Sequence, residues 1–205
     1  MSYYDLFTDK GQVMSQRFVD YFSGSSLDSR WTTTNVNGTN TFTMSDSVDG
    51  GFAITSGTSN GNRGMINFND KRQYAFNSSV LIAIVTRITA TNAMAIVGFA
   101  NTGLIQPTLN AAWLGNETSQ TFYRLVTSEG STQTASNTDI PVDTTTRSIK
   151  IECGSTNIKL TIDGVEKVDK TTDRPAAKLQ PFFYSRTLTT AAAESRIRYL
   201  EAYNT

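Results

Sequence analysis

The chain has no histidine among its 205 residues. That absence excludes Ser-His-Asp and Cys-His catalysis, imidazole general bases and histidine-ligated zinc. The only cysteine is Cys153, so no internal disulfide can form. Cys153 shares one face of an expected strand with Ile149 and Ile151. This pattern favours a small, buried core residue over a reactive thiol.

An excess of charge and a long apolar run are also missing. Eighteen Lys and Arg residues balance eighteen Asp and Glu residues. A chain with no net charge has no overall field to attract nucleic acid or an anionic membrane, so we expect neither as a partner. The longest apolar run, residues 80–85, is far shorter than the roughly 20 residues that span a bilayer, so we expect no membrane insertion. Residues 1–10 lack the basic and apolar regions of a secretory signal, and we expect none.

Short runs of alternating apolar and polar residues recur from residue 17 onward, with Gly, Asn, Asp and Ser between them. This alternation is typical of half-buried strands. It predicts an all-β fold of two packed antiparallel sheets, with a turn or two of helix as the alternative at 107–114. The expected strands are residues 17–22, 31–35, 39–45, 52–56, 63–67, 79–89, 93–100, 109–114, 121–127, 148–153, 157–162, 165–169, 181–185 and 193–203.

The clearest single element is the stretch 158–168, in which alternation runs up to Asp163-Gly164 and then resumes. An Asp-Gly pair accepts the positive φ values of a type I′ turn, so this stretch predicts a β-hairpin. Two other segments, 80–85 and 95–100, are apolar on both faces, which favours central strands. We expect a hairpin through Thr91-Asn92 to pair them as the spine of the fold.

No break in composition, repeat or linker divides the chain, so we expect one sandwich domain over residues 16–205. Residues 1–15 are expected to form a short N-terminal arm. This arm could be a first edge strand, or it could dock on another subunit. Its candidate docking residues are Tyr3, Tyr4, Leu6 and Phe7.

Three landmarks stand in order along the chain. The first is FVDYFSGSSLDSRW at 18–31, the second is the expected hairpin at 158–168, and the third is SRIRYLEAY at 195–203. Their order resembles the concanavalin A-like lectin/glucanase and laminin-G jelly rolls, over residues 17–203 in layout. The resemblance implies a two-sheet antiparallel jelly-roll sandwich whose final strand returns beside the first. Phe22 and Trp31 would supply large core area.

The resemblance also implies what an active site would need. Glycanases of this superfamily carry a Glu-x-Asp-x-x-Glu strand that places two carboxylates on one face. The chain has no such motif, and its nearest approaches, at 46–49 and 163–166, have the composition of turns. We therefore expect no catalytic residue and predict that the chain is not an enzyme.

Lectin and laminin-G relatives often bind calcium through Asp and Asn oxygens. The residues with suitable chemistry are Asp46, Asp49, Asn60 and Asn62, with turns that cap strands as the alternative. Calcium is the one metal ion that these residues could hold. We expect no cofactor.

Sugar binding needs aromatic rings and polar groups at a loop end or a concave surface. Trp113, Tyr123 and Arg124 are candidates for glycan contact, because residues 111–116 interrupt the clean alternation. The alternative for Trp113 is a buried position in the sandwich. Four arginines are spread singly among the expected strands, which predicts solvated strand faces: Arg63, Arg72, Arg87 and Arg186.

A fold typical of extracellular modules, in a chain without an export signal or a disulfide, fits a particle released by lysis. The first hypothesis is a non-enzymatic virion surface protein that decorates or cements a capsid. It would be made in the host cytoplasm, bind capsid proteins or neighbouring subunits, and form a homo-oligomer. The alternative is a carbohydrate-binding adhesin that recognises surface glycans. A third hypothesis is a polysaccharide-degrading enzyme.

Overall fold

The computed structural model describes residues 16–45, 50–88, 93–102, 110–116, 120–130 and 132–205. The described residues form fifteen strands and no helix, and therefore no helix that could cross a membrane. Tyr3, Tyr4, Leu6 and Phe7 lie outside the described residues, so the docking arm stays a prediction.

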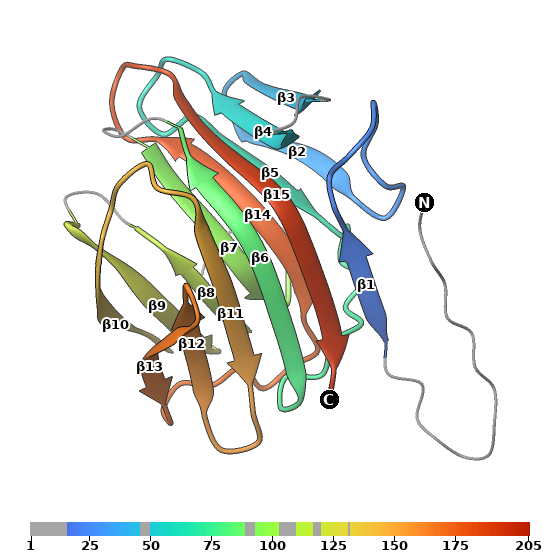
Figure 1. The fold of residues 1–205 in the computed structure, drawn as a ribbon, viewed down its shortest axis with the longest axis vertical. Coiled ribbons are helices and arrows are strands. Elements are labelled where there is room, and N and C mark those ends of the chain that lie inside the picture. The colour runs from blue at the N-terminus through green and yellow to red at the C-terminus, as the bar shows by residue number, and fades with distance from the viewer. Residues whose placement is uncertain (1–15, 46–49, 89–92, 103–109, 117–119, 131) are drawn as a thin grey trace.

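The strands form two antiparallel sheets that pack face to face (Figure 1). Sheet I has the order β13-β12-β11-β6-β15-β4-β3, with β1 also pairing with β15. Its strands are β1 (Arg17–Asp20), β3 (Asn40–Ser45), β4 (Gly51–Ser56), β6 (Ser79–Arg87), β11 (Arg147–Cys153), β12 (Ile158–Ile162), β13 (Val165–Lys170) and β15 (Ala193–Asn204). The all-β, two-sheet sandwich that the sequence predicts is confirmed.

Sheet II has the order β10-β9-β8-β7-β14-β5-β2. Its strands are β2 (Thr32–Asn37), β5 (Arg63–Asn67), β7 (Ala93–Ala100), β8 (Asn110–Gly115), β9 (Phe122–Glu129), β10 (Thr132–Pro141) and β14 (Gln180–Thr187). The helical alternative at 107–114 is wrong for residues 110–114, which belong to β8. Strand β10 was not expected, because its sequence TQTASNTDIP has no apolar alternation.

The core lies between the sheets, where alternation turns one side chain in two toward the opposite layer. Phe18 and Trp31 both pack edge-on against Phe68, with ring centroids 4.9 and 4.8 Å apart. The Trp31 indole N–H donates to the Asp20 carboxylate over 2.8 Å. Phe22 is also buried in this cluster. The opening segment therefore closes one end of the core, as the resemblance implied.

The predicted hairpin and the predicted pairing of the last strand with the first are both present. Strands β12 and β13 form a hairpin in which Asp163 and Gly164 have φ values of 52° and 80°, as a type I′ turn requires. The last strand returns beside the first, with Phe18 opposite Ala202. Cys153 is buried in the core, and burial raises the pKa of its thiol to about 12, so it is a packing residue.

The predicted pairing of the two apolar strands is wrong. Strand β6 pairs with β11 and β15 in sheet I, whereas β7 pairs with β14 and β8 in sheet II. The chain between them therefore crosses from one layer to the other. A strand that is apolar on both faces indicates a central position, but it does not indicate which sheet the strand joins.

Candidate functional site

Sheet II has a second apolar cluster on the face that points away from the core. Side chains on alternate positions of its central strands build this outer face, and they are as buried as the core itself. Met65 on β5 is 0% exposed, and Trp113 on β8 and Phe182 on β14 are 2% exposed. The outer face of an antiparallel sheet is commonly solvated and polar. This face therefore differs from the outer face of an ordinary sandwich, and we take it as the candidate site.

Trp113 lies in this cluster because two glycines make room for it. A Cβ on Gly98 would lie 2.5 Å from the Trp113 Cα, and one on Gly115 would lie 3.1 Å from Cζ3 of the indole. The indole Nε1 is buried and has no hydrogen-bond partner among the residues that the structure describes. A buried donor without a partner costs about 1–3 kcal/mol. The N–H is thus an unsatisfied donor, and an oxygen of a bound molecule would satisfy it where that molecule displaces the groups that cover the indole.

Two arginines face each other beside this cluster. Arg63 on β5 is directly opposite Arg186 on β14, and both project on the outer face. The Tyr184 hydroxyl, also on this face, lies near both guanidinium groups. Burial raises the pKa of Tyr184, and the neighbouring positive charges oppose that shift. The hydroxyl therefore stays neutral at pH 7.

Arg124 extends the polar end of the face across the sheet. Successive ladder partners connect Tyr184 to Ile96, Ile96 to Gly115 and Gly115 to Arg124. Neighbouring strands lie about 4.8 Å apart, so the backbones at Tyr184 and Arg124 are about 14 Å apart. Phe122 has the same orientation as Arg124 and is 42% exposed. We call these residues the arginine track: Arg63, Arg186, Tyr184, Arg124 and Phe122.

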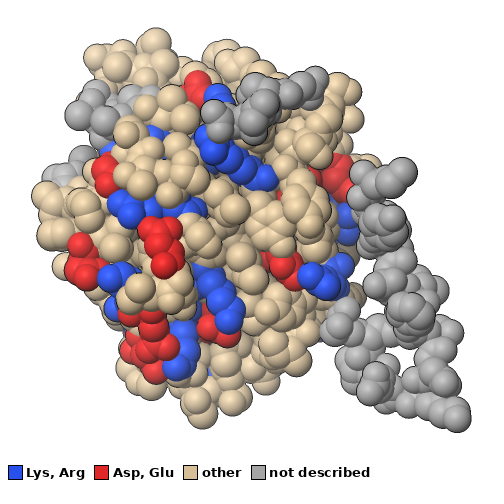
Figure 2. All heavy atoms as spheres, viewed as in Figure 1, with Lys and Arg blue, Asp and Glu red and all other residues tan. Residues whose placement is uncertain are grey.

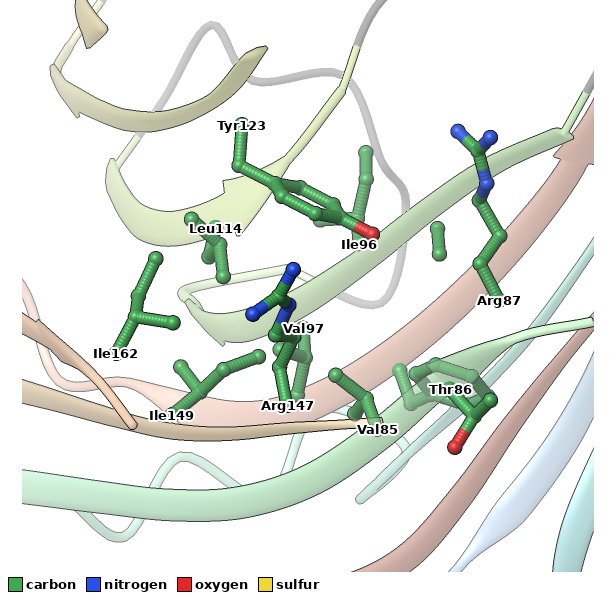
Figure 3. A pocket seen from close by; sticks show the side chains of 12 residues that line it. Val85, Thr86, Arg87, Ile96, Val97, Leu114, Tyr123, Arg147, Ile149 and Ile162 are labelled. Carbon is green, nitrogen blue, oxygen red and sulfur yellow. The ribbon is translucent and has the colours of Figure 1, made fainter. Parts of the chain in front are cut away.

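Of the three predicted glycan contacts, Trp113 and Arg124 share the outer face of sheet II and Tyr123 does not. Tyr123 points inward and lines a small, mostly apolar cavity between the sheets. Figure 3 shows Tyr123 and Arg147 reaching into this cavity from the two layers. Burial raises the pKa of the Tyr123 hydroxyl, which donates to the Asp143 carbonyl oxygen over 3.4 Å.

The cavity has the features of a structural end cap. Arg147 donates to the Asp143 carboxylate over 2.8 Å and to the Asp163 carboxylate over 3.0 Å. Arg87 is buried at the rim and donates to the Ala93 carbonyl oxygen. The prediction that Arg87 lies on a solvated strand face is therefore wrong. Arg63 and Arg186 lie partly exposed on the outer face, but they are direct neighbours and are not spread singly as predicted.

A glycosidase needs two carboxyl groups on the face that binds the sugar. The described residues of the sheet II strands place no Asp or Glu on it: Glu129 has the inward orientation, and Asp139 binds Lys167 of sheet I. Asp70, in the loop after β5, hydrogen-bonds with Gln180 at the far end of the face. Two carboxyl groups about 5–9 Å apart would be needed for hydrolysis. The described part of this face does not supply them.

Asp20 and Asp28 are the described acids whose environments differ most clearly. Burial raises the pKa of Asp20, whereas a hydrogen bond from Arg30 lowers the pKa of Asp28. Such a divergence can separate an acid from a nucleophile. Here, however, both oxygens of Asp20 are occupied, by the Phe22 N–H at 2.7 Å and the Trp31 N–H at 2.8 Å. The pair holds the β1–β2 connection in place.

No group of three or more His, Cys, Asp or Glu residues within the described ranges could hold a metal ion. Asn62 is buried against Gly38 and Gly57, where it packs as a turn residue. Asp46 and Asp49 lie outside the described ranges. Calcium binding thus stays a prediction.

Three solved structures illustrate the similarity of this fold to known proteins. A β-1,3-glucanase from Mycobacterium marinum has a TM-score of 0.68 at 10% identity, covering 95% of this chain and 100% of that one. A glycoside hydrolase family 16 endo-glucanase from Bacteroides ovatus has a TM-score of 0.67 at 13% identity, covering 89% and 98%. A pseudo β-1,3-glucanase of Mycobacterium tuberculosis has a TM-score of 0.66 at 12% identity, covering 92% and 98%. No protein-family model and no curated protein matches the sequence.

These comparisons correct the first functional hypothesis. The neighbours in fold are described as glucanases, endo-glucanases and a transglycosylase, which contradicts a non-enzymatic virion surface protein. The absence of a Glu-x-Asp-x-x-Glu strand supported that hypothesis, but identities of 10–13% show that the fold persists where most residues differ. Capsid contacts, self-association and a virion location stay predictions. The fold itself is the concanavalin A-like jelly roll that the sequence predicts.

Proposed function

We propose that this protein acts on polysaccharides and holds the glycan against the outer face of sheet II. The observation that carries the proposal is the buried, unpartnered N–H of Trp113 in an apolar cluster outside the core. Sites for small molecules and sugars are mostly apolar, with a few polar groups that fix orientation. The structural neighbours support the same class of ligand, since two of them are solved with oligosaccharides bound.

The outer face of sheet II has groups suited to the C–H surface of a sugar ring and to its hydroxyl groups. The C–H face of a sugar can pack on an exposed aromatic side chain such as Phe122. Hydroxyl oxygens can accept from the arginine track and, where the ligand displaces the groups that cover it, from the Trp113 N–H. Tyr184 is buried next to two arginines, and burial limits the orientations of its side chain before a ligand arrives.

Hydrolysis or transfer of a glycosidic bond would require two carboxylates near this face. Five acidic residues lie outside the described ranges: Asp5, Asp9, Asp46, Asp49 and Glu117. Glu117 follows the last residue of β8, Gly115, by two positions in the sequence. It is therefore the first acid to replace in a test of turnover.

Binding to a panel of neutral and acidic polysaccharides, measured by affinity gel electrophoresis, tests the proposal. Trp113→Phe keeps the ring and removes the N–H, so we expect affinity for the retarding polysaccharide to fall about three- to tenfold. Its thermal stability should be unchanged or higher, because a buried orphan donor is gone. Trp31→Phe is the matched control, since its N–H is already bonded to Asp20 and lies in the core. Equal binding by the wild-type protein and Trp113→Phe would remove the outer face from the proposal.

Product release from the same polysaccharides separates binding from cleavage. If the protein is a hydrolase or a transglycosylase, oligosaccharides accumulate with the wild-type chain and not with Glu117→Gln. Retention of the polysaccharide without any product would limit the function to recognition. Absence of binding across the whole panel would contradict the proposal.

A further inference from the structure

Within the described ranges, most Lys and Arg residues on the strands of sheet I are paired with acids, whereas two neighbouring arginines of sheet II are not. On sheet I, Arg17 pairs with Glu201, Lys150 with Glu152, and Arg196 with Glu194, with N–O distances of 2.8 to 3.0 Å. Figure 2 shows Lys and Arg side by side with Asp and Glu over the visible surface. Among the described residues, Arg63 and Arg186 form no ion pair.

The position of these two arginines makes the lack of an acid costly. Directly opposite residues on neighbouring antiparallel strands have Cα atoms about 5 Å apart, and like charges placed so are destabilising. The Nε atoms of both arginines are buried and have no hydrogen-bond partner. The neighbouring Tyr184 hydroxyl is neutral at pH 7 and offsets no charge. The two guanidinium groups thus lie close together without a negative charge from any described residue between them.

An oxyanion would satisfy this arrangement. Guanidinium groups bind carboxylate and sulfate oxygens through two parallel N–H donors, which neutral hydroxyl groups do not match. The terminal nitrogens of the two guanidinium groups would supply such a fork, since the Nε atoms are buried. An anion held here would relieve the repulsion between Arg63 and Arg186 as well as gaining charged hydrogen bonds.

A third positive charge lies along the same track. Arg124 is three strands away from Arg186. Ile96 and Gly115 occupy the two strands between them. A separation of about 14 Å suits a chain with repeated negative charges better than one small anion. Phe122 adds an exposed ring at the end of the track, on which a sugar can pack.

We infer that the polysaccharide recognised on the outer face of sheet II is acidic, bearing carboxylate or sulfate groups that bind along the arginine track. This inference rests on the proposed function and names the class of glycan. Nucleic acid is the other polyanion to consider. The apolar cluster beside the track favours the polysaccharide.

Matched polysaccharides test the inference. Polygalacturonate is compared with its methyl ester, and dextran sulfate with dextran, by isothermal titration calorimetry on the full chain. At low salt we expect at least one acidic member to bind about tenfold or more tightly than its neutral counterpart, with affinity falling as salt is added. Only polygalacturonate would bind at a carboxylate site, and only dextran sulfate at a sulfate site.

The double variant Arg63→Gln/Arg186→Gln should lose most of that preference. Arg17→Gln/Arg196→Gln removes the same charge from sheet I and should retain it, so the pair of variants separates the track from net charge. Equal losses in both double variants would overturn the inference, as would equally tight binding of single-stranded DNA. Tight binding of the neutral members alone would overturn it while leaving the proposed function intact. Failure of every polysaccharide would reject both. Circular dichroism verifies that each variant is folded.

Discussion

At the scale of single residues, the groups that carry the proposed function are those whose surroundings leave a polar atom unsatisfied. Trp31 and Trp113 illustrate the contrast. The Trp31 N–H is bonded to Asp20 inside the core, whereas the Trp113 N–H is buried outside the core without a partner. Unpaired buried donors are rare in native proteins, and one that persists commonly has a functional reason. The same contrast separates Arg63 and Arg186 from the ion-paired arginines of sheet I.

Asp28 should contribute to the pH dependence of stability at acidic pH. Its pKa is lowered in the folded protein, mainly by the hydrogen bond from Arg30. The ionised form therefore stabilises the fold above the unfolded-state pKa near 4, and this stabilisation is lost as pH falls through the lower folded pKa. Asp28→Asn removes the titrating group. We expect the free energy of unfolding of this variant, from urea titrations at pH 2 to 6, to depend less on pH than that of the wild-type chain. An identical dependence would contradict the role given to Asp28.

The site residues could be predicted only in part. A break in alternation at residues 111–116 singled out Trp113 and Arg124, and both lie on the outer face of sheet II. The adjacent Arg63 and Arg186 were expected to lie apart, because 123 positions separate them in the sequence. Only the register between β5 and β14 brings them together, and register between distant strands leaves no local signal.

At the scale of elements, local chemistry decides what can be predicted. The β12–β13 hairpin depends on two consecutive residues that accept positive φ, so its sequence alone was sufficient. The pairing of β6 and β7 depends on the rest of the fold, and there the prediction failed. Strand β10 is polar, and it is held by backbone pairing with β9, which side-chain patterns do not report.

The hairpin gives a prediction about conformational cost. Gly164 has a φ of 80°, and a Cβ there would meet nothing within 4 Å. Gly164→Ala should therefore lower the free energy of unfolding by about 1–2 kcal/mol through backbone strain alone. Gly164→Asn should lower it less, because Asn tolerates the left-handed region better. Denaturant titrations that rank the two variants in the opposite order would contradict the turn assignment.

At the scale of the whole molecule, sheet II is buried on both faces although the chain is a two-layer sandwich. Aromatic packing at Phe18, Trp31 and Phe68 accounts for the inner layer. The outer cluster contains the orphan N–H of Trp113, and the arginines without an ion pair lie beside it. This combination is why we assign the function to that face, within a fold shared with glucanases.

Tryptophan fluorescence during a polysaccharide titration tests the central claim most directly. The two tryptophans are on different sides of sheet II, since Trp31 is in the core and Trp113 is on the outer face. We predict a saturable change in emission with the wild-type chain and no change with Trp113→Phe, whose remaining reporter is Trp31. An emission change of the same size in Trp113→Phe, or binding that leaves the wild-type emission unaltered, would contradict a glycan site on the outer face of sheet II.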